Sequence, residues 1–226
     1  HERLINTRLF NEATVSLQDF RGYTIDIRID VKERWYIFPL PYVRPVDRNF
    51  TAWADQNYSL RRFDYGLKYS HYNFTGRNDF LRVWLITGYT REVEVAYDLP
   101  YTGRQLKHGF GGGFQFAGQR ELNVVNTENK QVFVNRDSLG YAGKNLLEQL
   151  NFSLRYYYRP GLRTRHYVKL SFNHVKIDSA VLNYNPDYFL NRKKNIGDPE
   201  LSYGIRYNNI DYVPDPTNRF FFEGGL

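Results

Sequence analysis

The chain has 226 residues, a formal net charge of +7, 18% aromatic residues and neither cysteine nor methionine. The lack of cysteine excludes a disulfide, a thiolate metal site and a cysteine nucleophile, and no run approaches the roughly 20 apolar residues of a transmembrane helix. With a mean hydropathy of −0.62, the composition fits a soluble domain that buries its aromatic residues. It also fits a membrane barrel that carries apolar residues at alternate positions.

Residues 1–32 predict part of a small α+β module. Apolar residues at helical spacing predict a helix over residues 2–10. A short strand is expected over residues 13–17, a turn over residues 19–22, and an amphipathic strand over residues 24–32. One helix and two strands are too short to hold a core, so we expect the module to have a further part upstream.

Residues 33–47 predict an extended linker. Pro39, Pro41 and Pro45 lie within it, and proline fixes φ and removes a donor from a strand ladder. The domain boundary is therefore placed here, with a second domain over residues 48–226.

The second domain shows a repeated alternation of apolar and polar residues. It is clear in residues 62–71, 92–99, 107–117, 149–159 and 200–208, and less clean in residues 80–89 and 164–177. Strands of nine to eleven residues match the length of a tilted strand that crosses a bilayer, whereas strands of soluble sheets usually have about five or six residues. The pattern favours an apolar face toward lipid.

The lengths of the connections indicate the same architecture, because outer-membrane barrels alternate short periplasmic turns with longer outer loops. If residues 49–54 form the first strand, the short connections at residues 73–79, 100–106, 159–163 and 213–218 share one side. The long connections at residues 120–144 and 178–199 share the other. The count is eight strands and the start of a ninth at residues 219–226. Because an open edge in lipid is costly, we expect this to be the N-terminal portion of a larger antiparallel barrel.

Candidate catalytic and metal-binding features are weak. Gly109, Gly111, Gly112 and Gly113 lack the Lys-Ser/Thr of a phosphate loop, so we expect them to allow tight curvature of a barrel strand or close approach of a plug. No histidine has a carboxylate or second histidine at metal-ligand spacing. Adjacent residues on a strand point to opposite faces, which argues against Ser70 as a hydrolase nucleophile beside its neighbouring histidine. We expect neither an enzyme nor a cofactor.

The basic run Asn191, Arg192, Lys193 and Lys194 belongs to a predicted loop. The other basic residues alternate with apolar ones along strands, and no nucleic-acid-binding motif accompanies them. We expect no nucleic-acid partner.

The stretch IRIDVKERWYIFPLPYVRPVDRNFTAW at residues 27–53 resembles the passage from the last periplasmic domain into the barrel of BamA/TamA-type outer-membrane assembly factors. This is the family with POTRA modules and a surface-antigen barrel, and the resemblance is to Bacteroidota versions. NTRLFNEATVSL, at residues 6–17, resembles the end of the final POTRA module. YGLKYSHYNFTGRND at residues 65–79 and VAYDLPY at residues 95–101 resemble the second and fourth barrel strands with their turns.

The resemblance implies a barrel of about sixteen strands in the bacterial outer membrane, with the N-terminal segment in the periplasm. It implies a seam at which substrate strands pair with the edge of the first strand, here Asn49, Phe50, Thr51, Ala52, Trp53 and Ala54. Gly76 and Arg77 match a periplasmic turn. The implied partners are outer-membrane lipid, nascent outer-membrane β-barrel proteins and accessory assembly proteins.

Three alternatives stay open. A translocator barrel of the same superfamily would export a passenger domain. A passive porin-like channel would lack the module in front. A soluble β-sandwich, from a different class, would bind carbohydrate through its aromatic residues.

Overall fold

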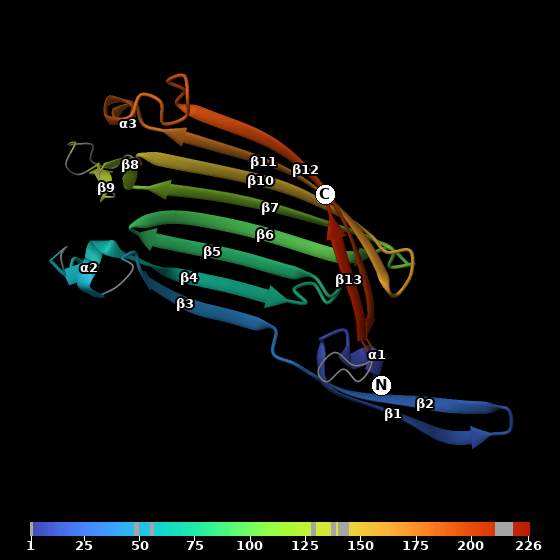
Figure 1. Ribbon diagram of the computed structural model, residues 1–226. Coiled ribbons are helices and arrows are strands. Elements are labelled where there is room, and N and C mark those ends of the chain that lie inside the picture. Colours follow the sequence, from blue (N-terminus) through green and yellow to red (C-terminus); the bar gives the residue numbers. More distant parts are fainter. Residues whose placement is uncertain are drawn as a thin grey trace.

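The structure, a computed structural model, describes residues 2–47, 50–54, 57–127, 130–136, 139, 145–210 and 219–226. Its main feature is one curved antiparallel sheet in the order β13-β12-β11-β10-β7-β6-β5-β4-β3 (Figure 1). The strands are β3 (Ile37–Pro45), β4 (Phe63–Tyr72), β5 (Phe80–Gly88), β6 (Thr90–Thr102), β7 (His108–Gln119), β10 (Leu147–Tyr158), β11 (Thr164–Ile177), β12 (Asn195–Ile210) and β13 (Arg219–Gly225). The prediction of a mainly β fold, with eight strands and a ninth that begins at residue 219, is confirmed.

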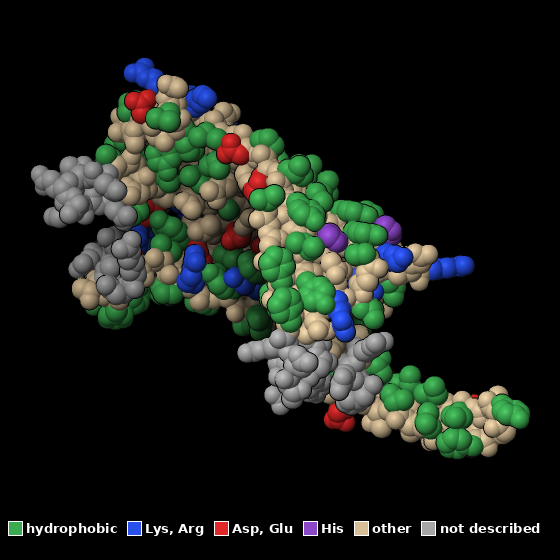
Figure 2. Space-filling view, turned by 45° about the vertical axis from the view of Figure 1, so that its right-hand side comes forward, with side chains coloured by type: hydrophobic (Ala, Val, Ile, Leu, Met, Phe, Trp, Pro, Cys, Tyr) green, Lys and Arg blue, Asp and Glu red, His purple; other side chains and the backbone are tan. Residues whose placement is uncertain are grey.

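The strands pair in a register that places apolar residues opposite apolar residues across the whole sheet. Phe152 of β10 lies opposite Phe114 of β7 and Phe172 of β11, so apolar side chains form continuous rows on one face. The adjacent residue, Ser153, lies opposite Gly113 and belongs to the other face. Figure 2 shows hydrophobic side chains over the outer, convex surface and charged ones in the hollow. The convex face is therefore apolar and the concave face polar.

The convex face has no covering layer in the described part of the chain. Many of its large apolar side chains are between 41% and 72% exposed. They include Tyr65, Leu67, Leu85, Val93, Val95, Phe110, Phe114, Phe152, Leu154, Leu170, Phe172, Leu201 and Tyr203. Such a continuous apolar surface is far larger than an ordinary soluble monomer exposes.

The prediction of a linker over residues 33–47 is wrong for β3, which forms one edge of the sheet and pairs with β4. Proline is tolerated in an edge strand where its missing N–H would point away from the ladder. Pro39, Pro41 and Pro45 are all spaced by even numbers of residues, so they lie on the same side of the strand. The predicted number of strands in the main sheet is still correct, because β3 takes the place of the predicted first strand.

The prediction of a first strand over residues 49–54 is also wrong. Phe50–Ala54 forms the short helix α2, and Asn49 lies outside the described residues. Phe50 and Trp53 are three residues apart, which is helical spacing, and their rings pack edge-on with centroids 5.5 Å apart. Tyr58 packs against both rings. The aromatic cluster explains why this segment forms a helical turn, which lies at the end of the sheet (Figure 1).

A separate hairpin precedes the sheet (Figure 1). It consists of β1 (Phe10–Arg21) and β2 (Thr24–Glu33), after the short helix α1 (Glu2–Ile5). The two predicted strands are present, but the turn lies at residues 22–23 instead of 19–22 and the helix ends earlier than expected. Val15 and Leu17 face Ile29 and Ile27 across the hairpin, and all four stay exposed.

The two long connections form a small core at one end of the sheet. They contain the hairpin β8 (Glu121–Thr127) and β9 (Lys130–Asn135) and the helix α3 (Ser179–Tyr184). The buried residues of this cap are Leu122, Val124, Val134, Leu146, Leu147, Ile177 and Val181. Asn185 Nδ2 donates to the Val124 carbonyl at 2.8 Å, which ties the second connection to the first. None of the helices in the described ranges is long and apolar enough to cross a membrane.

The cap gives a matched pair of substitutions in β8. Val124 is 3% exposed and its neighbour Val125 is 40% exposed. Val124→Ala should destabilise the cap by about 1–3 kcal/mol, because it leaves a cavity. Val125→Ala should change it by less than about 0.5 kcal/mol. Hydrogen exchange of the β8 and α3 amides measures both, and equal protection in the two variants would contradict the placement of the cap core.

Candidate functional site

The concave face holds a polar hollow of about 220 Å³. The residues that line it come from β5, β6, β7, β10 and β11. They are Arg82, Glu94, Ala96, Gly113, Phe114, Gln115, Asn151, Ser153, Arg155 and Lys169. Charges within it are paired across strands: Arg155 Nη1 lies 3.1 Å from Asp98 Oδ2, and Arg82 forms an ion pair with Glu94. The hollow is therefore a polar surface in which two arginines are paired with carboxylates of β6.

Glycines of β7 form part of the floor of this hollow. A Cβ on Gly111 would lie 2.1 Å from Asp98 Oδ1, and one on Gly113 would lie 3.0 Å from Ser153 Oγ. Both glycines leave space for side chains of the neighbouring strands, while close approach of a plug stays a prediction. They let side chains of β6 and β10 meet above β7.

Edge strand β3 is fastened to the sheet from the concave side. Lys68 of β4 places its ammonium 4.0 Å from the ring centroids of both Tyr42 on β3 and Trp84 on β5. Arg44 of β3 pairs with Asp64 of β4 at 3.0 Å, and the Asp64 side chain is only 2% exposed. A cation between two rings adds attraction beyond the backbone ladder.

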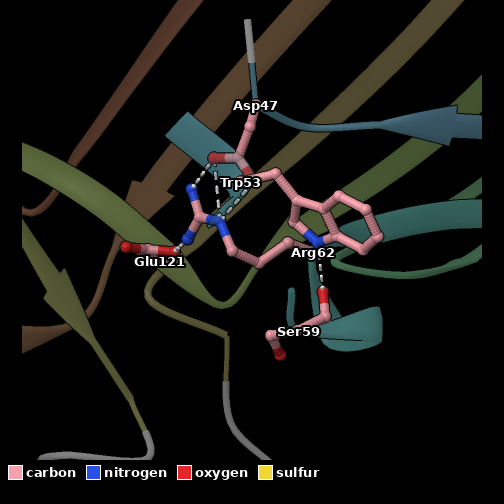
Figure 3. Close-up of polar contacts among 5 residues, drawn as sticks. All are labelled: Asp47, Trp53, Ser59, Arg62 and Glu121. Atoms are coloured by element: carbon pink, nitrogen blue, oxygen red, sulfur yellow. Dashed lines mark hydrogen bonds and ion pairs between the residues drawn. The ribbon is translucent and has the colours of Figure 1, made fainter. Parts of the chain in front are cut away.

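Three segments meet in an ion-pair network at the end of the sheet that carries the long connections (Figure 3). Arg62, at the end of the 3₁₀ helix Leu60–Arg62, donates through Nε and Nη2 to Asp47 at 2.7–2.9 Å. Its Nη1 donates to Glu121 of β8 at 2.8 Å. Trp53 Nε1 donates to the Ser59 carbonyl at 3.1 Å, which closes the loop around the arginine.

Burial gives this network its strength. Side-chain exposures are 17% for Arg62, 7% for Asp47 and 11% for Glu121. The hydrogen bonds to Asp47 raise the pKa of Arg62 above its ordinary value, although desolvation opposes the shift. Burial, with the nearby negative charge of Glu121, raises the pKa of Tyr89, whose ring lies 5.6 Å from the guanidinium. The arginine stays charged and holds the loop between β3 and β4 to the first long connection.

The opposite end of the sheet has short turns, and the first contains the predicted turn residues Gly76 and Arg77. Gly76 has φ +80°, a conformation that favours glycine, and Arg77 is exposed. Asp79 organises this turn by accepting from the Thr75 N–H at 2.9 Å and from the Tyr97 hydroxyl at 2.8 Å. Sequence reasoning found the turn but missed Asp79.

The predicted first-strand site was an edge of the sheet. In the described residues β3, and not residues 49–54, forms that edge. The site residues Phe50, Thr51, Trp53 and Ala54 lie in α2 and do not form a sheet edge. Ala52 belongs to the same helix. Pro39, Pro41 and Pro45 are separated by even numbers of residues, which fits one side of an edge strand. A linker does not require this spacing, and the sequence analysis did not use it.

Within the described ranges, no group of three or more His, Asp or Glu side chains has the arrangement of a metal site. Histidines instead pair with tyrosines on the convex face: His108 Nδ1 and the Tyr156 hydroxyl are 2.8 Å apart, as are His166 Nδ1 and the Tyr203 hydroxyl. These pairs lie at the end with the short turns.

No protein-family model and no curated protein matches the chain. Among solved structures, it is similar to the crystal structure of BamA from Haemophilus ducreyi lacking POTRA domains 1–3, with 16% identity and a TM-score of 0.49. The alignment covers 99% of this chain and 40% of that one. The chain therefore spans well under half the length of this structural relative.

Loss of the Arg62 charge should strongly destabilise the end of the sheet that carries the long connections. Arg62→Gln leaves two mostly buried carboxylates without a cation, at an expected cost of about 3 kcal/mol or more. Arg206→Gln is the control, because Arg206 pairs with Glu223 across β12 and β13 at 46% and 37% exposure and should cost less than about 1 kcal/mol. Urea unfolding in detergent measures both. Similar small losses would show that the network does not hold the loops.

The turn around Asp79 should weaken in acid. Desolvation alone would raise the pKa of Asp79, but the hydrogen bonds from Thr75 and Tyr97 outweigh it and the pKa is lowered. A folded pKa below the unfolded value stabilises the turn above about pH 4. This stabilisation is lost as the pH falls through the folded pKa. Protection of the Thr75 amide against exchange should follow that loss, and Asp79→Asn should remove the pH dependence. Unchanged titration in the variant would contradict this assignment.

Proposed function

We propose that the chain forms the N-terminal portion of a bacterial outer-membrane β-barrel that assembles or inserts other outer-membrane proteins. The observation that carries the proposal is an open antiparallel sheet with an apolar, exposed convex face. An exposed apolar belt with a polar interior is what a barrel in lipid requires. The hairpin at the front would be the end of a POTRA-like module in the periplasm, and outer-membrane lipid would cover the convex face.

Two further features support a membrane position. The His108–Tyr156 and His166–Tyr203 pairs lie on the convex face near the short turns, where an aromatic belt would meet the membrane–water interface. The long connections gather at the other end, as outer loops do. The short-turn end would then face the periplasm.

In the described residues β3 forms an edge of the sheet, and such an edge would favour assembly over a passive channel if it stays accessible in the whole barrel. An unpaired edge offers backbone donors and acceptors to another strand, and a nascent outer-membrane β-barrel protein would supply such strands. This role needs no cofactor, no covalent chemistry and no nucleic acid. Accessory assembly proteins would bind the periplasmic side.

A translocator barrel that exports a passenger domain is the second candidate, since it would share the belt and the polar hollow. The carbohydrate-binding sandwich is disfavoured, because the convex aromatic residues form unbroken rows over the sheet and the described chain places no second sheet upon them.

Depletion of the protein in its host tests the assembly role. We expect folded outer-membrane β-barrel proteins to fall in amount, while inner-membrane proteins stay constant. Normal levels of the barrel proteins together with loss of one exported protein would contradict assembly and favour the translocator.

Lipid contact is tested by two adjacent residues of β12. Leu201 lies on the convex face and is 72% exposed, whereas Ser202 faces the hollow. In lipid vesicles Leu201→Arg should cost about 2–4 kcal/mol, while Ser202→Arg should cost less than about 1 kcal/mol. For a soluble sheet, an arginine at such an exposed position would change stability by less than about 0.5 kcal/mol. A near-zero effect at Leu201 in urea unfolding would contradict the membrane position.

A further inference from the structure

Two neighbouring segments of the sheet carry basic residues and no acidic ones. Residues 99–120, which include β7, and residues 149–177, which include β10 and β11, contain neither aspartate nor glutamate. The Arg159 N–H donates to the Lys107 carbonyl at 2.7 Å, so the turn before β7 and the turn after β10 lie side by side at the end with the short turns (Figure 1). Cations therefore gather at this end without carboxylates from their own segments.

Four cations form a row across the concave face at this end. Lys107 lies opposite Arg159, in continuation of the β7–β10 register. The β10–β11 register continues from Arg159 to Arg165, and Arg165 lies opposite Arg206 of β12. Residues directly opposite each other share one face of a sheet. We call these four residues the cationic row.

The cationic row is only partly neutralised by the described residues. Arg206 pairs with Glu223 at 2.9 Å, whereas no described carboxylate forms an ion pair with the other three members of the row. Arg159 and Arg165 instead share the ring of Tyr101, with guanidinium carbons 4.3 Å and 5.2 Å from its centroid. Like charges directly opposite each other destabilise a sheet, so the fold holds this surplus of positive charge at a cost.

The surplus continues one step further into the polar hollow. Lys169 lies opposite Arg155, and both residues line the hollow. Asp98 pairs with Arg155 at 3.1 Å, but no carboxylate in the described ranges pairs with Lys169. Arg155 Nε and Ser171 Oγ have no hydrogen-bond partner among the described residues. The concave face therefore holds unused donors as well as unused positive charge beside the cationic row.

We propose that the cationic row binds an extended acidic segment of a partner polypeptide, which enters the concave face from the end with the short turns. Carboxylates suit this row because a guanidinium presents a planar pair of N–H donors to them. Neighbouring strands are about 4.8 Å apart, so the row, which crosses β7, β10, β11 and β12, spans about 14 Å. Three acidic residues at alternate positions of an extended peptide span about 13 Å.

An anionic lipid and a nucleic acid fit the cationic row less well. The acyl chains of a lipid would have to lie in the polar hollow, because the apolar side chains are on the opposite face of the sheet. A nucleic acid would stack its bases on free aromatic rings, but two guanidiniums already cover Tyr101. The neighbouring Tyr167 lies against Gly204, where a Cβ would be 2.3 Å from the Tyr167 ring. The face, the charge and the span favour a polypeptide.

This inference deepens the proposed function and rests on it for the side of the membrane. The end with the short turns would face the periplasm, so the acidic segment would belong to a periplasmic polypeptide. The surplus of positive charge rests only on the strand register and on the ion pairs of the described residues.

A synthetic peptide with three glutamates at alternate positions, separated by serines, tests the cationic row. The full chain in uncharged detergent micelles is titrated with the fluorescent peptide at low salt, where charges are least screened, and empty micelles give the background. A peptide with glutamine at the three positions should bind at least about tenfold more weakly. Three consecutive glutamates span only about 7 Å and should bind at least about threefold more weakly. Equal binding of either control peptide would overturn the proposal.

Substitutions in the row give the reciprocal test. R159Q/R165Q should weaken binding of the alternating peptide at least about tenfold, whereas R159K/R165K keeps the charges and should bind within about fivefold of the unaltered chain. R192Q/K193Q/K194Q is the control, because it removes three charges from an exposed loop at the opposite end of the sheet. This control should change the affinity less than about twofold. Equal losses in the two glutamine variants would show that net charge alone attracts the peptide.

Urea unfolding in the same micelles separates binding from a structural role of the row. Since Arg165 lies opposite another arginine, R165Q relieves repulsion and should leave the urea midpoint unchanged or raise it, while peptide binding falls. A lower midpoint together with unchanged peptide binding would show that Arg165 serves the fold, and would overturn the proposal.

Two further outcomes identify the partner and separate this inference from the proposed function. Displacement of the peptide by short-chain phosphatidylglycerol at lower concentration than by unlabelled peptide would assign the row to lipid and overturn the proposal. Normal assembly of outer-membrane β-barrel proteins in depleted cells would overturn the proposed function alone, because peptide binding to the row does not depend on it.

Discussion

The backbone hydrogen-bond ladder is the constraint on which this structure depends. Eight antiparallel pairings hold nine strands in one register, and with that register fixed, every side chain is committed to one face. The row through Phe114, Phe152 and Phe172 shows the result on the convex side. A slip by one residue in a single strand would put charged side chains on the apolar surface, so the ladder fixes the chemistry of both faces at once.

The two faces of the sheet differ in how their side chains are stabilised. The convex face buries almost nothing within the described chain, so its apolar residues do not stabilise the fold in water, and a covering of lipid would supply the missing burial. The concave face compensates its own charges, as in the pair of Arg155 with Asp98. The buried apolar cluster lies instead in the cap, where Val181 is completely buried, and Arg62 joins that end to the loop before β4. The sheet is thus anchored at one end, and in the described residues β3 and β13 form its two edges.

The sequence predicted most of the sheet because its period of two is a local signal. Strand positions, the two faces and the end that carries the long connections all came from alternation and spacing. The edge strand was missed because proline usually argues against a strand, and only its pairing partner shows that the three missing donors point outward. Helix α2 was missed because its stability comes from Trp53, Phe50 and Tyr58 packing in three dimensions. The ion pair of Arg62 with Glu121, 59 residues away, has no local signature at all.

The central claim is that the convex face contacts lipid and the concave face contacts water. Single cysteines placed one at a time along β10 from Leu150 to Tyr156, in a chain otherwise free of cysteine, can each carry a fluorophore in lipid vesicles. Quenchers confined to the acyl chains should act at even-numbered positions and water-soluble quenchers at odd-numbered ones, with a strict period of two. Equal access of the water-soluble quencher to both sets would contradict the account.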